Sequence, residues 1–158
     1  MTSTETITIT SPATSSGTWV HQEHDFKASP DRVYEALMDQ RQFAAFSGAS
    51  AEIDRTPGGA FSLIRGRVTG RNVELVANKR IVQAWRVVPW AEGIYSIVRF
   101  ELLPTHAGTR LVLDHSGFPP EDVDSRHGGW RRVYFDPLRA HLEAGAGPSA
   151  TPTEGAGR

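Results

Sequence analysis

The sequence predicts an α+β fold, in which an antiparallel sheet carries its helices on one face. Three observations lead to this prediction: a first strand is followed by two short helices, six short strands then follow with only turns between them, and one long helix ends the domain. Strands joined by short turns pair as antiparallel neighbours. The helices must therefore cover the apolar face of one sheet of six or seven strands.

The first strand and the two short helices come at the start of the domain. Polar and apolar side chains alternate through residues 18–28, as in a half-buried strand. Ser29 and Pro30 are typical of the N-cap and the first position of a helix, and apolar side chains then recur at helical spacing. A second helical turn is predicted at residues 41–46, and Gly48 ends it.

The six later strands are predicted at residues 49–53, 60–65, 68–77, 81–88, 95–103 and 109–116. Gly, Pro and Asn residues mark the turns between them. In the strand that starts at residue 95, Val98, Phe100 and Leu102 share one face, whereas Arg99 and Glu101 lie on the other. This alternation indicates a sheet with one face in a core and one face in water.

The long helix begins after Gly117 and Pro119 interrupt the last strand. Its apolar stripe is predicted to contain Val123, His127, Trp130, Tyr134, Leu138 and Leu142. The arginines predicted to lie outside the stripe are Arg131, Arg132 and Arg139. Pro137 has no N–H for the carbonyl of Val133, so we expect a kink there.

Length and composition predict one domain at residues 17–144, with disordered tails at residues 1–16 and 145–158.

The net charge is −1 and the 17 basic residues are spread along the chain, which argues against nucleic acid or a membrane as partner. The chain has no Cys, so disulfides, thiolate catalysis and cysteine-ligated metals are excluded. Because we find no secretory signal and no run of roughly 20 apolar residues, we expect a cytoplasmic location.

Five stretches carry a resemblance to a known family. They read SPDRVYEALMD, TPGGAFSL, GRVTGRNVELVANKRIVQAWRVVPWAEGIYSIVRFELLP, GTRLVLDHSGFP, and GW followed by YFDPLRAHL, and they cover residues 26–143. On these stretches the chain resembles the homologues of the activator of the heat-shock protein 90 ATPase. The resemblance implies the helix-grip fold, also called START-like or SRPBCC, in which a long C-terminal helix closes a curved antiparallel sheet.

The middle stretch, with NKRIVQAWR and the later WAEGIYS, is similar to the C-terminal domain of the co-chaperone in this family. The resemblance implies a role in the stress response and makes a chaperone of the heat-shock protein 90 class a candidate partner. In the family, a separate N-terminal domain supplies the principal contact to the chaperone and most of the ATPase stimulation. We find no stretch long enough for such a domain, so ATPase activation does not follow from the resemblance.

Large aromatic side chains fall at positions that face the predicted gap between sheet and helix. The candidate pocket residues are Phe61, Leu63, Trp85, Phe100, His115, Trp130 and Tyr134. A cavity lined by aromatic side chains with a few polar groups is the usual form of a small-molecule site. The alternative is that these side chains only fill the core, as aromatic residues commonly do. An apolar small molecule is therefore one expected ligand.

His115 is the candidate catalytic residue of an alternative hypothesis. By alternation it shares the inner face with Leu111 and Leu113, so it could act as general base in a helix-grip enzyme of the aromatase/cyclase or hydrolase type. That role requires an open cavity beside the imidazole and a carboxylate or hydroxyl that orients it. The alternative is a core histidine whose ring nitrogens bond nearby groups. His127, on the predicted stripe, could approach it.

Other chemistry has little support in the sequence. His21 and His24 are three residues apart on a strand and point to opposite faces, so they predict an exposed edge strand and no metal site. Nucleophile elbows, phosphate loops and zinc-binding helix motifs do not occur, so no cofactor is expected. Arg65, Arg67 and Arg71 are interpreted as a solvated basic face.

Three functional hypotheses follow. The leading one is a non-enzymatic binding module for an apolar small molecule or a protein partner, and the second is the enzyme that uses His115. The third is a chaperone cofactor that acts through the outer face of the sheet, with Arg86 and Arg99 as candidate contact residues.

Overall fold

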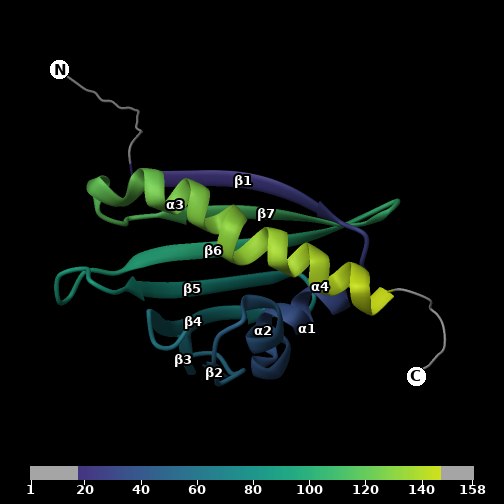
Figure 1. Ribbon diagram of the computed structural model, residues 1–158, viewed down its shortest axis with the longest axis horizontal. Helices are drawn as coiled ribbons and strands as arrows, with labels where there is room; N and C mark the ends of the chain where they lie inside the picture. Colours follow the sequence, from purple (N-terminus) through teal and green to yellow (C-terminus); the bar gives the residue numbers. More distant parts are fainter. Residues whose placement is uncertain (1–17, 147–158) are drawn as a thin grey trace, which may run out of the picture.

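The computed structural model describes residues 18–146, and its elements follow the order that the sequence predicts (Figure 1). The strands are β1 (Trp19–Phe26), β2 (Ala51–Ile53), β3 (Ala60–Leu63), β4 (Val68–Val76), β5 (Arg80–Val87), β6 (Ser96–Thr105) and β7 (Gly108–Ser116). The helical elements are α1 (Pro30–Met38), α2 (Gln40–Ser47), the 3-10 turn η2 (Pro120–Asp122), α3 (Val123–Gly129), the π-helical segment η3 (Trp130–Phe135) and α4 (Asp136–Ala146).

The seven strands form one antiparallel sheet in the order β1-β7-β6-β5-β4-β3-β2. Strands β2 to β7 are neighbours in the sheet in the same order as in the chain, because short turns join them. β1 instead pairs with β7 along its whole length, from Trp19 opposite Ser116 to Phe26 opposite Thr109. β1 and β2 are therefore the two edges of the sheet, and the predicted α+β class is confirmed.

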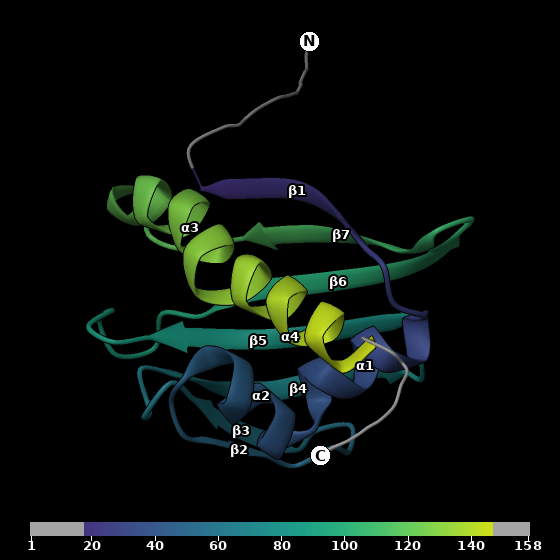
Figure 2. The same cartoon turned by 45° about the vertical axis from the view of Figure 1, so that its right-hand side comes forward.

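The helices lie on one face of the sheet. The continuous helical segment from α3 to α4 crosses this face obliquely, and α1 and α2 pack beside α4 (Figures 1 and 2). Side chains that alternate toward the helices form the core: Val98 and Leu113 are 0% exposed and Phe100 is 1% exposed. Arg99, between them on β6, is exposed on the outer face.

Ser29 and Gly48 bound the two short helices. Ser29 is the N-cap of α1, but its hydroxyl makes no cap hydrogen bond; its carbonyl instead accepts from the Val33 N–H at 3.1 Å. Gly48 ends α2 with a φ of 74°, a left-handed conformation that glycine adopts without strain.

The C-terminal helix changes its hydrogen-bond pattern directly before Pro137. In η3 the Asp136 N–H bonds to the carbonyl of Arg131, five residues earlier. Pro137 has no N–H with which to continue the α-helical ladder. The proline therefore follows a π-helical segment, and the extra residue in this turn changes which side chains face the sheet.

Part of the predicted apolar stripe is wrong, because the helix contains the π-helical segment η3. Trp130, Tyr134, Leu138 and Leu142 are buried as predicted, and Phe135 is buried as well. His127 is exposed, because the period of 3.6 residues does not continue through the π turn. The predicted approach of His127 to His115 is therefore wrong, and the neighbouring Arg126 faces inward instead.

The predicted tails lie outside the described residues, except that residues 145 and 146 belong to α4. Within residues 18–146, no helix has both the length and the hydropathy needed to cross a membrane.

Candidate functional site

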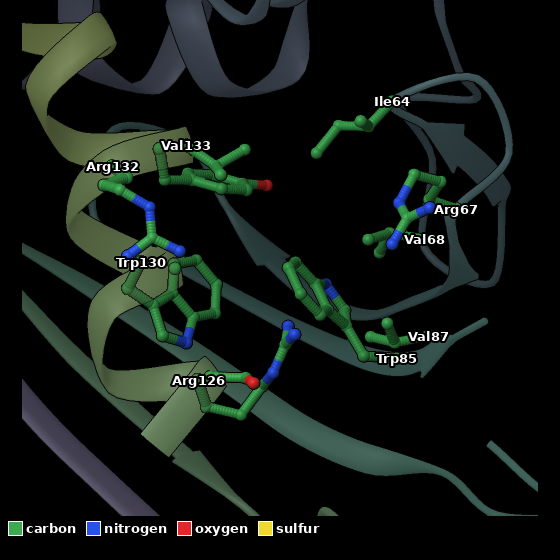
Figure 3. A pocket seen from close by; sticks show the side chains of 12 residues that line it. Ile64, Arg67, Val68, Trp85, Val87, Arg126, Trp130, Arg132 and Val133 are labelled. Carbon is green, nitrogen blue, oxygen red and sulfur yellow. The ribbon is translucent and has the colours of Figure 1, made fainter. Parts of the chain in front are cut away.

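A pocket with a volume of about 290 Å³ lies between the sheet and the C-terminal helix (Figure 3). One side is formed by β5, the start of β4 and the turn before it, and the other side by α3 and η3. The pocket thus lies where the π-helical segment faces the sheet.

Three aromatic side chains line the pocket: Trp85 of β5, and Trp130 and Tyr134 of η3. They are 2%, 3% and 4% exposed, respectively. The rings of Trp85 and Trp130 stack with their centroids 4.9 Å apart, and the Trp130 ring is 4.7 Å from that of Tyr134. Such packing fixes the rings against one another.

Buried amides hold the Trp85 ring from the sheet side. Trp85 Nε1 donates to Gln83 Oε1 at 3.0 Å, and Gln83 Nε2 donates to Asn72 Oδ1 at 3.1 Å. Asn72 Nδ2 in turn donates to the backbone carbonyl of Asp54 at 2.7 Å. Because these buried polar groups bond one another, the indole has a defined orientation.

His115 holds the second indole. Trp130 Nε1 donates to His115 Nδ1 at 3.0 Å, and His115 Nε2 lies 2.7 Å from Ser96 Oγ. Because Nδ1 accepts a hydrogen bond, we assign the proton of the neutral ring to Nε2, which donates to Ser96. Burial and, to a lesser extent, the charge of Arg126 lower the pKa of His115 to about 3. The imidazole is therefore neutral at neutral pH.

This geometry does not suit His115 to general base catalysis. The imidazole is 0% exposed and does not line the pocket. The hydroxyl of Ser96 could orient it, but the indoles of Trp85 and Trp130 face the pocket instead, each 5.5 Å from the imidazole between ring centroids. His115 acts on the pocket only through the position of Trp130.

Three arginines that were not among the candidate pocket residues also line the pocket: Arg67, Arg126 and Arg132. The guanidinium ends of Arg67 and Arg126 are directed toward its interior (Figure 3). Arg67 is exposed, as expected for a solvated face, and it also lines this pocket, whereas Arg65 and Arg71 do not. Burial lowers the pKa of Arg126, and the charge of Arg67 lowers it further, although the Asp122 carboxylate opposes both effects.

The remaining candidate pocket residues, Phe61, Leu63 and Phe100, belong to the core and do not line this pocket. Phe100 supports the aromatic wall, since its ring centroid lies 5.7 Å from that of Trp130 and 6.0 Å from that of Tyr134. The expectation of one groove lined by all seven candidates is corrected accordingly.

The two candidate contact residues on the outer face differ in what they do. Arg99 is exposed and pairs with Glu101, with 3.0 Å between Nη2 and Oε2. Arg86 donates to three backbone carbonyls of the loop at residues 90–94, over distances of 2.7, 3.0 and 3.2 Å. Arg86 therefore holds the loop after β5 in place.

His21 and His24 lie on opposite faces of β1 as predicted. His21 is exposed and its Nδ1 lies 2.7 Å from Asp114 Oδ1. The interpretation of an exposed strand is wrong for His24, which is 7% exposed, bonds Gln22 and packs on Phe135 with ring centroids 4.2 Å apart. No group of three His, Cys, Asp or Glu side chains within residues 18–146 could hold a metal ion.

Comparison with known proteins identifies relatives of the chain. A model of the family described as Activator of Hsp90 ATPase homolog 1-like protein matches residues 27–143. The human Activator of 90 kDa heat shock protein ATPase homolog 1 is 30% identical over 121 residues, which are 77% of this chain and 36% of the human protein. The mouse homolog 2 is 28% identical over 124 residues, which are 78% of this chain and 38% of the mouse protein. The matched part is thus little more than a third of these relatives.

Solved structures give the same fold. An HSP90 activator from Plasmodium falciparum superposes with a TM-score of 0.73 at 26% identity, over 80% of this chain and 97% of the other. A protein from the dynemicin biosynthetic locus superposes with a TM-score of 0.69 at 23% identity, over 80% of this chain and 48% of the other, and supports the fold alone. Together with the sheet order, these neighbours confirm the predicted helix-grip fold.

Proposed function

The chain belongs to the family of Activator of Hsp90 ATPase homolog 1-like proteins, and we propose that it is a non-enzymatic module that binds a small, largely apolar molecule between its sheet and its C-terminal helix. The observation that carries this proposal is the pocket of about 290 Å³ lined by Trp85, Trp130 and Tyr134. The relatives' names describe activators and not enzymes.

Two features of the pocket support ligand binding. Its volume is close to the lower limit of small-molecule sites, about 300 Å³. The two indoles are held by hydrogen bonds to Gln83 and His115, so a ligand would lose little free energy in ordering them. The same bonds argue against catalysis, because they leave His115 neutral, buried and without access to a bound molecule.

Thermal melts and native mass spectra against fatty acids, aromatic polyketides and flavonoids test the proposal. A ligand at a hundred times its Kd should add about 2.7 kcal/mol of apparent stability. The same ligand should change the tryptophan fluorescence, because Trp85 and Trp130 line the pocket. No shift with any compound, together with no co-purified mass, would contradict ligand binding.

A variant that fills the pocket supplies the specific control. Val133 lines the pocket and is 38% exposed, so Val133→Phe should occupy the space without entering the core, and should remove the ligand-induced shift. Val73→Phe makes the same change at a position that is 56% exposed and outside the pocket. It should leave the shift unchanged.

A chaperone partner is the second candidate function, and the outer face of the sheet favours it. Trp19 of β1 and Ile97 of β6 both lie opposite Ser116 of β7, and they are 53% and 45% exposed. Tyr95, two residues before Ile97, is 55% exposed. Apolar side chains gathered on an exposed face often mark a contact with another protein. The names of the relatives make the heat-shock protein 90 class the partner to test.

Binding of the chain to a purified chaperone of this class, together with the ATPase rate of the chaperone, tests the second candidate. Trp19→Ser and Arg99→Ala should weaken the complex, whereas Val73→Ser, an equally exposed apolar position outside this group, should not. Arg86→Ala is a poor probe, because it would also release the loop at residues 90–94. Unchanged binding by both outer-face variants would count against this function.

A further inference from the structure

We propose that the ligand of this pocket carries an oxyanion, such as a carboxylate, on a flat apolar body. This inference rests on the proposed function and names the chemical class of its ligand. It starts from three charged residues that line the pocket, Arg67, Arg126 and Arg132. An entirely apolar ligand does not explain their presence there.

The charges around the pocket are unbalanced. Among the residues that the structure describes, its lining contains three guanidinium groups and no carboxylate. Within residues 18–146, Arg126 is the one member of this group with a carboxylate inside salt-bridge distance, that of Asp122. Arg126 is partly buried, whereas Arg67 and Arg132 are exposed. Positive charges around one pocket repel one another, and a neutral ligand would remove water from them without replacing it. An anion would instead pair with them.

Arg126 gives the most specific indication. Its Nε atom is buried and has no hydrogen-bond partner in the described part of the chain. The nearest carboxylate oxygen, Asp122 Oδ2, lies 3.6 Å away and already accepts from Trp90 Nε1 at 2.7 Å. Burying a charged donor without an acceptor destabilises the fold. An oxyanion in the pocket would compensate for this charge by pairing with the guanidinium group.

One molecule can reach both the arginines and the indoles. Arg126 extends from the helix and Arg67 from the turn before β4, and both point into the space beside Trp85 and Trp130 (Figure 3). A guanidinium group bonds a carboxylate through two parallel N–H donors, and an indole stacks on a flat apolar group. The oxyanion would lie between the two guanidinium groups, and the apolar body would lie against the indoles.

Three probes that share one ring system test this ligand class by isothermal titration calorimetry: 2-naphthoate, the neutral 2-naphthamide and the cationic 2-naphthylmethylammonium. We expect the carboxylate to bind at least tenfold more tightly than the amide, and the cation to bind most weakly. An increase in NaCl concentration should weaken the binding of 2-naphthoate and leave that of 2-naphthamide nearly unchanged, because salt screens only the charged pair.

Substitution of the arginines shows whether the preference arises in the pocket. Arg126→Gln and Arg67→Gln should each weaken 2-naphthoate at least fivefold and change 2-naphthamide less than twofold. Arg65→Gln is the matched control, because it removes the same charge two residues from Arg67 at a position that does not line the pocket. Thermal melts of each variant establish that it is folded. Because Arg126→Gln and Arg67→Gln change different elements of the fold, each tests the preference separately.

The outcomes separate this inference from the proposed function. Equal affinity for 2-naphthoate and 2-naphthamide would overturn the inference and leave apolar ligand binding intact. A loss with Arg65→Gln as large as that with Arg126→Gln would also overturn it, because the preference would then come from net charge. If neither these probes nor the apolar panel binds, both proposals fail.

Discussion

The indole N–H of Trp130 donates to Nδ1 of His115 across 3.0 Å, which connects the wall of the pocket to the core of the sheet. The bond exists only while the imidazole is neutral, because a protonated ring has no acceptor. Ser96, 2.7 Å from Nε2, completes the unit. Protonation of His115 would therefore break the hydrogen bond that holds Trp130.

Acid should destabilise the chain through two buried histidines. The pKa of His115 is about 3 and that of His24 about 4, both below the ordinary value of 6.5. Because folding depresses these values, their contribution to stability is complete above pH 6.5 and is lost as the pH falls toward 4. Each histidine should contribute a slope of about 1.4 kcal/mol per pH unit in this range.

Urea unfolding at a series of pH values from 7.5 to 4.5 measures this slope. His24→Gln should reduce the slope, because it removes one of the two titrating groups. His21 acts in the opposite sense, since its hydrogen bond to Asp114 raises its pKa, but its side chain is 42% exposed. A variant with the same slope as the unaltered chain would rule out His24 as a source of the acid sensitivity.

His115→Leu should destabilise the fold by leaving two polar groups unpaired. Trp130 Nε1 would lose its acceptor and Ser96 Oγ its partner, at about 1–3 kcal/mol for each buried group that is left without a hydrogen bond. Adding Ser96→Ala to His115→Leu should restore part of the loss, because the unpaired hydroxyl is then absent. Equilibrium unfolding followed by tryptophan fluorescence compares the variants. A double variant less stable than His115→Leu would mean that Ser96 has another role.

The sequence predicts the aromatic wall of the pocket well, because burial determines both elements that form it. Alternation along β5 places Trp85 on the inner face, and spacing along the helix places Trp130 and Tyr134 on the buried stripe. These patterns also give the strand order from β2 to β7, since short turns allow few other pairings.

The positions of Arg126 and Arg67 at the pocket could not be predicted from the sequence, for two structural reasons. Arg126 faces the pocket because the π-helical segment changes the helical period, and no residue pattern in the sequence specified that segment. Arg67 faces it because Ile64, Arg65 and Gly66 all have positive φ values, of 54°, 56° and 81°, which turn the chain sharply before β4. Only the glycine signals such a turn in the sequence.

Arg126→Met should make the chain more stable, by about 1 kcal/mol, while it weakens the binding of an anion. The substitution removes a partly buried charge whose Nε has no hydrogen-bond partner in the described residues, and it keeps most of the apolar side chain. The Asp122 carboxylate left behind is 26% exposed and retains the hydrogen bond from Trp90, so it does not become an isolated buried charge.

Arg131→Met, at an exposed position on the same helix, should change stability by less than about 0.5 kcal/mol. Urea unfolding of both variants measures the difference. If Arg126→Met instead destabilises the chain, the pair with Asp122 supports the fold, and the positive charge at the pocket has a structural reason that needs no ligand.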